Sequence, residues 1–123
     1  MKKNPTILII EDDTALNDAY KTILETASYS AFTAFNGEEA LEVAAKHKPD
    51  LIFLDLRMPG MDGIGFLKAY QPKKNNPEAH IIVFSNYDMQ AEVDEAYELG
   101  AERYVLKALA APNDLLKIVR DLI

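Results

Sequence analysis

The sequence predicts a single α/β domain, residues 1–123, in which a parallel sheet of five strands is covered by helices on both faces. Short apolar runs alternate along the chain with longer segments whose apolar residues recur at spacings of three and four, as in strands followed by amphipathic helices. The runs at residues 7–10 and 51–54 contain no polar residue, which is typical of strands buried on both faces. Strands and helices in alternation imply right-handed crossovers and therefore a parallel sheet.

The strands are expected at the apolar runs, namely residues 6–10, 30–34, 51–54, 80–84 and 103–106. The first helix follows Asp13, whose carboxylate can bond the free N–H groups of the first turn. Its apolar stripe consists of Leu16, Ala19, Tyr20, Ile23, Leu24 and Ala27. Asn36 is expected to cap the second helix, and Pro49 to stop it.

The third helix is expected over about residues 63–70, with Pro72 ending it. Asp88 is expected to cap the fourth, which ends at Gly100 because glycine readily adopts the left-handed conformation. The polar segment 71–79 is predicted to be an exposed connection without chemistry. The last helix buries Leu115, Leu116, Ile118, Val119 and Leu122.

The composition excludes several classes of function. Apolar residues make up 49% of the 123-residue chain, which is enough for a core, and cysteine is absent, which excludes disulfides and thiolate chemistry. The formal charge of −7 argues against direct binding to nucleic acid or an anionic membrane. The first apolar run is too short for a signal peptide, and no run approaches the roughly 20 apolar residues of a membrane span. We therefore expect a cytoplasmic protein.

Acidic side chains follow two of the predicted buried strands. Glu11 and Asp12 come directly after the first strand, and Asp55 follows the third. The carboxyl ends of parallel strands meet at one edge of the sheet, where α/β proteins bind their ligands. Carboxylates gathered there need a cation among them, and an all-oxygen set suits Mg²⁺, with Mn²⁺ as an alternative.

Two further polar residues stand at strand ends of the same kind. Ser85 follows the fourth strand, and Lys107 follows the fifth. Together with the acids they suit phosphoryl transfer, in which Lys107 and the metal neutralise the phosphoryl oxygens, Ser85 donates a hydrogen bond and Asp55 attacks. Neither His47 nor His80 is placed to serve as a general base for the serine, which argues against a Ser-His-acid triad.

The motifs that surround these residues resemble those of the receiver domain of bacterial two-component response regulators. They are Ile-Leu-Ile-Ile-Glu-Asp-Asp at residues 7–13, Asp-Leu-Ile-Phe-Leu-Asp-Leu-Arg-Met-Pro-Gly-Met-Asp-Gly at 50–63, Ile-Ile-Val-Phe-Ser at 81–85, and Gly-Ala at 100–101 leading to Tyr-Val-Leu-Lys at 104–107. The resemblance covers essentially the whole chain. It implies a flavodoxin-like (βα)5 three-layer sandwich with strand order 2-1-3-4-5.

The resemblance also implies roles for individual residues. Asp55 would accept a phosphoryl group from the phosphohistidine of a sensor histidine kinase or phosphotransfer protein. Glu11, Asp12, Asp55 and the backbone carbonyl of Arg57 would hold Mg²⁺. On this reading the chain is a signalling switch that catalyses only its own phosphotransfer and dephosphorylation, and not an enzyme acting on other substrates.

The switching residues follow from the same resemblance. Ser85 and Lys107 would bind the phosphoryl oxygens, and the ring of Tyr104 would move inward when the serine shifts. The downstream protein partner would bind the face formed by the fourth helix, last strand and last helix, about residues 89–122. The protein would be a monomer or a phosphorylation-dependent homodimer, and it would be either a stand-alone receiver or part of a longer regulator.

Three positions depart from the family pattern. Ala108 follows Lys107 where the family usually has proline with a cis bond, so we expect slower switching. Asn86 stands where a smaller residue is common and could narrow access to the acceptor. Arg57, with Tyr87, is expected to slow hydrolysis of the phosphorylated state.

Other functions fit less well. A degenerate receiver that docks partners without phosphorylation is left open by the missing proline but opposed by the intact acids. An aspartyl-phosphate phosphatase of the haloacid dehalogenase type would want a second acid where Arg57 stands, and a cap for which the chain is too short. A flavin-binding electron carrier would need a phosphate loop after the first strand, where the acids would repel phosphate.

Overall fold

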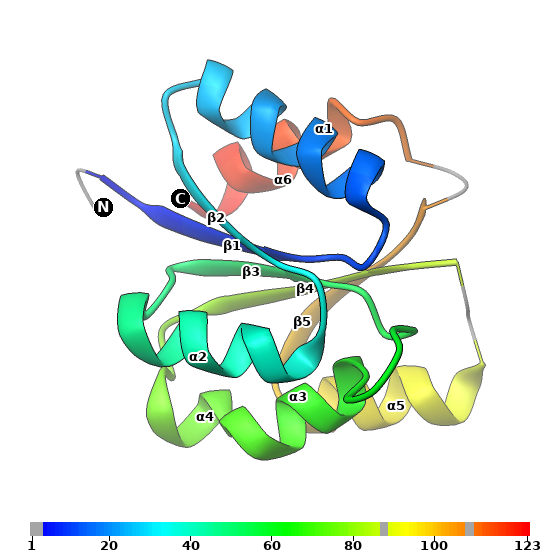
Figure 1. Ribbon diagram of the computed structural model, residues 1–123. Coiled ribbons are helices and arrows are strands. Elements are labelled where there is room, and N and C mark those ends of the chain that lie inside the picture. Colours follow the sequence, from blue (N-terminus) through cyan, green and yellow to red (C-terminus); the bar gives the residue numbers. More distant parts are fainter. Residues whose placement is uncertain (1–3, 87–88, 108–109) are drawn as a thin grey trace.

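The sheet has the predicted parallel topology. The structure is a computed structural model that describes residues 4–86, 89–107 and 110–123. Its five strands lie in the order β2-β1-β3-β4-β5, and every neighbouring pair is parallel. Helices cover both faces (Figure 1). The three-layer architecture and strand order expected from the sequence are therefore confirmed.

The strands agree closely with the predicted ranges. They are β1 (Thr6–Ile10), β2 (Ser30–Ala34), β3 (Leu51–Leu54), β4 (His80–Ser85) and β5 (Ala101–Leu106). The strand β5 begins two residues earlier than predicted because its pairing with β4 contains an irregularity. Ile81 lies opposite Ala101 and Ile82 opposite Arg103, so Glu102 is an extra residue on β5, as in a β-bulge.

The helices form two layers. On one face of the sheet lie α1 (Thr14–Thr26) and α6 (Asp114–Leu122) (Figure 1). On the other face lie α2 (Gly37–His47), α3 (Gly63–Tyr70), α4 (Pro72–Asn75) and α5 (Gln90–Glu98). Among the described residues, no helix combines the length and the apolar character that a membrane crossing requires.

Side-chain caps fix where three of the helices begin. As predicted, Asp13 accepts a hydrogen bond from the Leu16 N–H and Asn36 caps α2. Asp62 caps α3 in the same way. The predicted cap Asp88 lies outside the described residues, and the structure assigns the N-cap of α5 to Met89.

The segment after α3 is more structured than the sequence suggested. The helix α3 ends because Gln71 adopts the left-handed conformation, with φ of 50°. Pro72 then starts the short helix α4 and is buried, which the prediction did not include, whereas residues 73–75, 77 and 78 are exposed as predicted. Proline suits this first helical position, since its missing N–H would have no partner there. The Lys73 Nζ donates to the main-chain carbonyl of Glu98 at 2.6 Å, which joins α4 to the end of α5.

Two apolar clusters hold the layers together. Alternate residues of each strand point to opposite faces, so an unbroken apolar run supplies both clusters. On the α2–α5 side the cluster includes Leu8, Ile52, Leu54 and Phe66, and on the α1–α6 side it includes Ile7, Leu24, Phe53 and Val119. Each fully buried side chain of this kind contributes about 1.5–3 kcal/mol. The ends of β1 and β3 are thereby fixed in position.

Candidate functional site

A pocket of about 270 Å³ lies at the carboxyl ends of the strands. Its walls come from the loop after β1, the residues after β3, β4 and β5, and the first turn of α1. The lining residues are Glu11, Asp12, Asp13, Leu16, Asp55, Arg57, Asn86 and Lys107. Most of the residues that the sequence singled out at strand ends therefore share one pocket.

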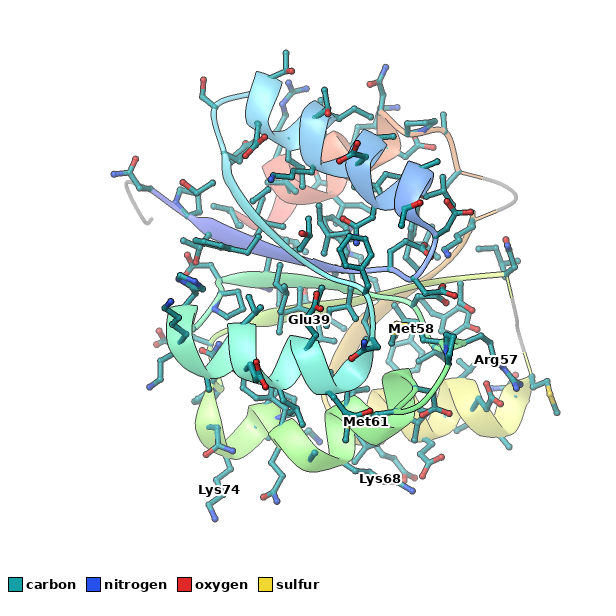
Figure 2. The ribbon with its side chains drawn as sticks, in the orientation of Figure 1. Glu39, Arg57, Met58, Met61, Lys68 and Lys74 are labelled. Carbon is teal, nitrogen blue, oxygen red and sulfur yellow. The ribbon has the colours of Figure 1, made fainter. Side chains whose placement is uncertain are left out.

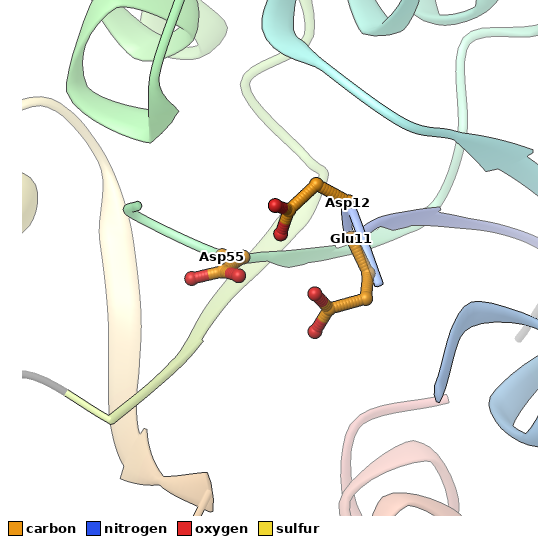
Figure 3. Close-up of side chains that lie close together, drawn as sticks. All are labelled: Glu11, Asp12 and Asp55. Carbon is orange, nitrogen blue, oxygen red and sulfur yellow. The ribbon is translucent and has the colours of Figure 1, made fainter. Parts of the chain in front are cut away.

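Three carboxylates converge in this pocket. Glu11, Asp12 and Asp55 each offer an oxygen, and these oxygens all lie within 4.8 Å of one another (Figure 3). The convergence follows from the topology, because β1 and β3 are neighbours and Ile10 pairs with Leu54. Glu11 and Asp55 are buried, whereas Asp12 is exposed. An all-oxygen set of this kind with one side open to water fits a hard divalent cation such as Mg²⁺, which retains several waters.

Lys107 brings a cation to the same place. Its Nζ lies 3.0 Å from Asp55 Oδ2 and also forms an ion pair with Glu11 Oε1. The side chain is only 10% exposed, so solvent screens these interactions weakly. The structure therefore places the Lys107 amino group at the acidic cluster. Ala108, on which the expectation of slower switching rests, lies outside the described residues.

Burial and neighbouring charges together set the pKa values of Glu11 and Lys107. Burial raises the pKa of Glu11 from 4.5 to about 7, even though Lys107 and the Asp13 N–H act in the opposite direction. Burial lowers the pKa of Lys107, but hydrogen bonds and charges from Glu11 and Asp55 outweigh it, and the net shift is upward. The lysine therefore remains charged near neutral pH, while Glu11 exchanges its proton in that range.

Main-chain N–H groups orient two of the acids. The Arg57 N–H donates to Asp55 Oδ1 at 3.1 Å, and the Asp13 N–H donates to Glu11 Oε2 at 3.1 Å. Lys107 contacts the other oxygen of Asp55, so the Asp55 carboxylate is held on both sides. This preorganised environment fixes the direction in which Asp55 faces the pocket.

Asn17 supports the acidic loop and was not identified from the sequence. It is 1% exposed, and its Nδ2 donates to the main-chain carbonyls of Glu11 at 2.9 Å and Ala34 at 3.2 Å. The signal was present in the sequence, because Asn17 lies three and seven residues before Tyr20 and Leu24 on the buried face of α1. A polar residue on an apolar stripe needs hydrogen-bond partners inside the protein.

The other predicted residues lie near the pocket in different environments. Ser85 is fully buried at the end of β4, where it pairs with Leu106, and the next residue, Asn86, is exposed and lines the pocket. Tyr104 is partly buried and packs against the apolar cluster on the α2–α5 side. Tyr87, expected to act with Arg57, lies outside the described residues.

The side chain of Arg57 points toward α5. Its Nη2 lies 2.5 Å from Glu92 Oε1 and 3.7 Å from the Met89 sulfur. Figure 2 shows Arg57 in the loop after β3, on the side nearest the beginning of α5. Sequence reasoning did not identify this contact, because 35 residues separate the two partners.

The fold and this acidic pocket with its lysine define an α/β domain built around a strand-end aspartate. Residues 7–120 match the family model of the response regulator receiver domain, and the chain belongs to this family. Among curated relatives, it is 34% identical to sporulation initiation phosphotransferase F of Bacillus subtilis, over 94% of this chain and 88% of that protein. It is 38% identical to the chemotaxis protein CheY of Thermotoga maritima, over 82% of this chain and 83% of that protein. The chain spans about half of another relative, the nitrate/nitrite response regulator NarL of Escherichia coli, with 53% of that protein covered.

Solved structures give the same result for the fold. The chemotaxis protein CheY4 of Vibrio cholerae superposes with a TM-score of 0.87 at 27% identity, covering 98% of this chain and 99% of that chain. A CheY-like receiver domain protein of Methanospirillum hungatei gives a TM-score of 0.89 at 28% identity, covering 97% of this chain and 93% of that chain. The predicted flavodoxin-like receiver fold is confirmed.

Proposed function

We propose that this receiver domain accepts a phosphoryl group on Asp55 in a Mg²⁺-dependent reaction and that the modification changes its binding to a protein partner. The donor would be the phosphohistidine of a sensor histidine kinase or a phosphotransfer protein. One observation carries the proposal. The Asp55 carboxylate is buried beside two further acids, with Lys107 3.0 Å from one oxygen and the Arg57 N–H 3.1 Å from the other.

The chemistry needs little more than this arrangement. An oxygen of Asp55 attacks phosphorus, the bond between phosphorus and the donor imidazole nitrogen breaks, and the imidazole leaves with the electron pair and takes up a proton. Lys107 compensates the charge of the phosphoryl oxygens, and Ser85 donates a hydrogen bond to one of them after a local shift. Water later cleaves the acyl phosphate. The domain thus acts as a switch that catalyses only its own modification and its reversal.

The metal ligands are proposed to be the carboxylates of Glu11, Asp12 and Asp55 and the backbone carbonyl of Arg57. Bound Mg²⁺ would supply charge neutralisation at the phosphoryl oxygens, and Mn²⁺ suits the same donors. Asp12 faces solvent, which leaves room for the retained waters. The two buried acids, Glu11 and Asp55, are held in place by Lys107 and by main-chain N–H groups.

The partner surface is proposed to be the face formed by α5, β5 and α6. On α5 and just before it, Met89 is 59% exposed and Tyr97 is 43% exposed, as is common for side chains that contact a protein partner. Ser85 and Tyr104 would transmit the change to this face, with the domain as a monomer or a phosphorylation-dependent dimer. The complete acidic set and the contacts of Lys107 favour this switch over a docking module that does not need phosphorylation.

Intact-mass measurement after incubation with acetyl phosphate and Mg²⁺ tests the proposed function. We expect a single addition of about 80 Da, the mass that a phosphoryl group contributes when it replaces a proton. Removing the metal with EDTA should prevent the addition, because the crowded carboxylates then repel the incoming phosphoryl group. Folded protein that gains no mass with Mg²⁺ present would contradict the proposal.

Mg²⁺ affinity is expected to fall as the pH falls below 7. The pKa of Glu11 in the folded protein is raised from 4.5 to about 7, so a proton competes with the metal below that value. For one competing proton, the apparent Kd should rise about tenfold between pH 8 and pH 6. Isothermal titration calorimetry measures it, and Glu11→Gln should flatten the profile. An unchanged slope in that variant would show that another group titrates.

The metal-free protein should show the matching trend in stability. Because the folded state binds more protons than the unfolded state between pH 4.5 and about 7, the unfolding free energy contributed by Glu11 is fully present below pH 4.5 and is lost as the pH rises through 7. Urea denaturation at pH 5.5 and pH 8 measures this difference. Added Mg²⁺ should stabilise the protein more at pH 8.

A further inference from the structure

Basic side chains from three successive segments contact α5 along its length. The contacts are Arg57 Nη2 with Glu92 Oε1 at 2.5 Å, Lys68 Nζ with Glu95 Oε2 at 3.1 Å, and Lys73 Nζ with the carbonyl oxygen of Glu98 at 2.6 Å. The acceptors recur every three residues, so they follow one side of the helix. Figure 2 shows Arg57 and Lys68 on the side of the molecule where α3 lies beside α5.

Arg57 differs from the two lysines because it also contacts the acceptor aspartate. Its N–H donates to Asp55 Oδ1 at 3.1 Å, and the residue lines the acidic pocket. Its guanidinium pairs with Glu92 on α5. One residue therefore joins the phosphoacceptor to the helix that begins the proposed partner surface.

We propose that the ion pair between Arg57 and Glu92 couples the state of Asp55 to the position of α5. In the unmodified protein the pair holds α5 against the loop after β3. A phosphoryl group, which carries about −1.5 to −2 charges, competes with Glu92 for the guanidinium and weakens this attachment. This inference rests on the proposed phosphorylation of Asp55 and adds a route that does not pass through Ser85 or Tyr104.

The expected size of the effect follows from the exposure of the pair. The side chains are 43% and 27% exposed, so the pair resembles a surface ion pair of modest strength. Losing it should increase the opening equilibrium of α5 by about two- to fivefold. Coupling is reciprocal, so a partner that binds α5 and breaks the pair should alter phosphorylation of Asp55 by a similar factor.

Hydrogen–deuterium exchange across residues 90–98 tests the coupling, with acetyl phosphate and Mg²⁺ as the probe and intact mass to verify the modification. In the wild type, phosphorylation should speed exchange about two- to fivefold. In Glu92→Gln, exchange should already be faster without acetyl phosphate and should respond to it less strongly than in the wild type, because only the route through Ser85 and Tyr104 remains. The double variant Arg57→Met, Glu92→Gln should respond to phosphorylation as Glu92→Gln does, since both changes remove the same ion pair, while its basal exchange also reflects loss of the Arg57 contact with Met89.

Glu95→Gln is the matched control. It removes the ion pair with Lys68 on the same helix, and that lysine does not line the acidic pocket. Exchange in this variant should still respond to phosphorylation, even if its basal rate rises. A wild type that gains the mass without faster exchange, or a Glu92→Gln variant that responds as strongly as the wild type, overturns the coupling alone. Absence of the mass addition overturns the proposed function and the coupling with it.

Discussion

Asp55→Asn is expected to abolish the gain of about 80 Da on incubation with acetyl phosphate and Mg²⁺. The amide cannot act as the attacking oxygen nucleophile, and no other carboxylate of the described residues contacts both Lys107 and the Arg57 N–H. The fold should persist, because the amide has nearly the same shape and its oxygen can still accept either hydrogen bond. Removing one of three crowded carboxylates also relieves repulsion. Circular dichroism and intact mass together measure the two effects.

Asp13→Asn is the matched control for that variant. Asp13 lines the same pocket and caps α1, and asparagine caps helices as well as aspartate does. This variant loses the same charge and should still be phosphorylated. If Asp55→Asn gained the mass, Asp12, the exposed acid of the cluster, would be the first alternative acceptor to examine by peptide mapping.

Gly63→Ala is expected to lower the unfolding free energy by about 1–3 kcal/mol, the usual cost of overpacking. A Cβ at Gly63 would lie 2.5 Å from the carbonyl oxygen of Asp55 and 2.8 Å from the Leu56 Cα. Both atoms belong to the main chain, so the segment that carries Asp55, the proposed phosphoacceptor, would have to move. Phosphorylation by acetyl phosphate should therefore also slow. Urea denaturation measures the stability change.

Gly65→Ala, in the same helix, separates this clash from the general effect of adding a methyl group. Its Cβ would meet side-chain and not main-chain atoms, namely Met61 Cγ at 3.0 Å, which can shift, and Oδ1 of the capping Asp62 at 3.3 Å. Alanine also favours the helical conformation over glycine by about 0.8–1 kcal/mol. The net change should lie near zero, so equal losses in the two variants would rule out the main-chain clash as the cause.

Most of the fold could be predicted from the sequence because local signals agree with the tertiary structure. The apolar runs set the strands, and Asp13, Asn36 and Gly100 mark helix ends that the structure retains. The extra residue on β5 was missed because a bulge depends on pairing with β4, which no local pattern records. The start of α4 was missed because a proline at this point in the sequence indicates the end of a helix. Here the left-handed conformation of Gln71 allows a second helix to begin directly at Pro72.

The acids and the lysine of the site could also be predicted. Each follows a strand, and the carboxyl ends of parallel strands lie at the same edge of the sheet. The residues that hold them in place could not. Gly63 has no positive φ to mark it, and its importance lies in the close approach of the Asp55 carbonyl. The partner of Arg57 lies on a helix distant in sequence, and an arginine two residues after an acid has no local signal for that contact.

The short helix α4 has a consequence for how α5 can move. At the end of α5, Pro72 lies so close that a Cβ on Gly100 would be 3.1 Å from its side chain, and the Lys73 Nζ donates to the carbonyl of Glu98. The other end is attached near Met89 through Glu92. If that attachment is lost, α5 should move least near Gly100, where α4 still contacts it, and most near Met89. A partner that responds to this motion should bind at the Met89 end of α5, where the same rotation displaces the surface farthest.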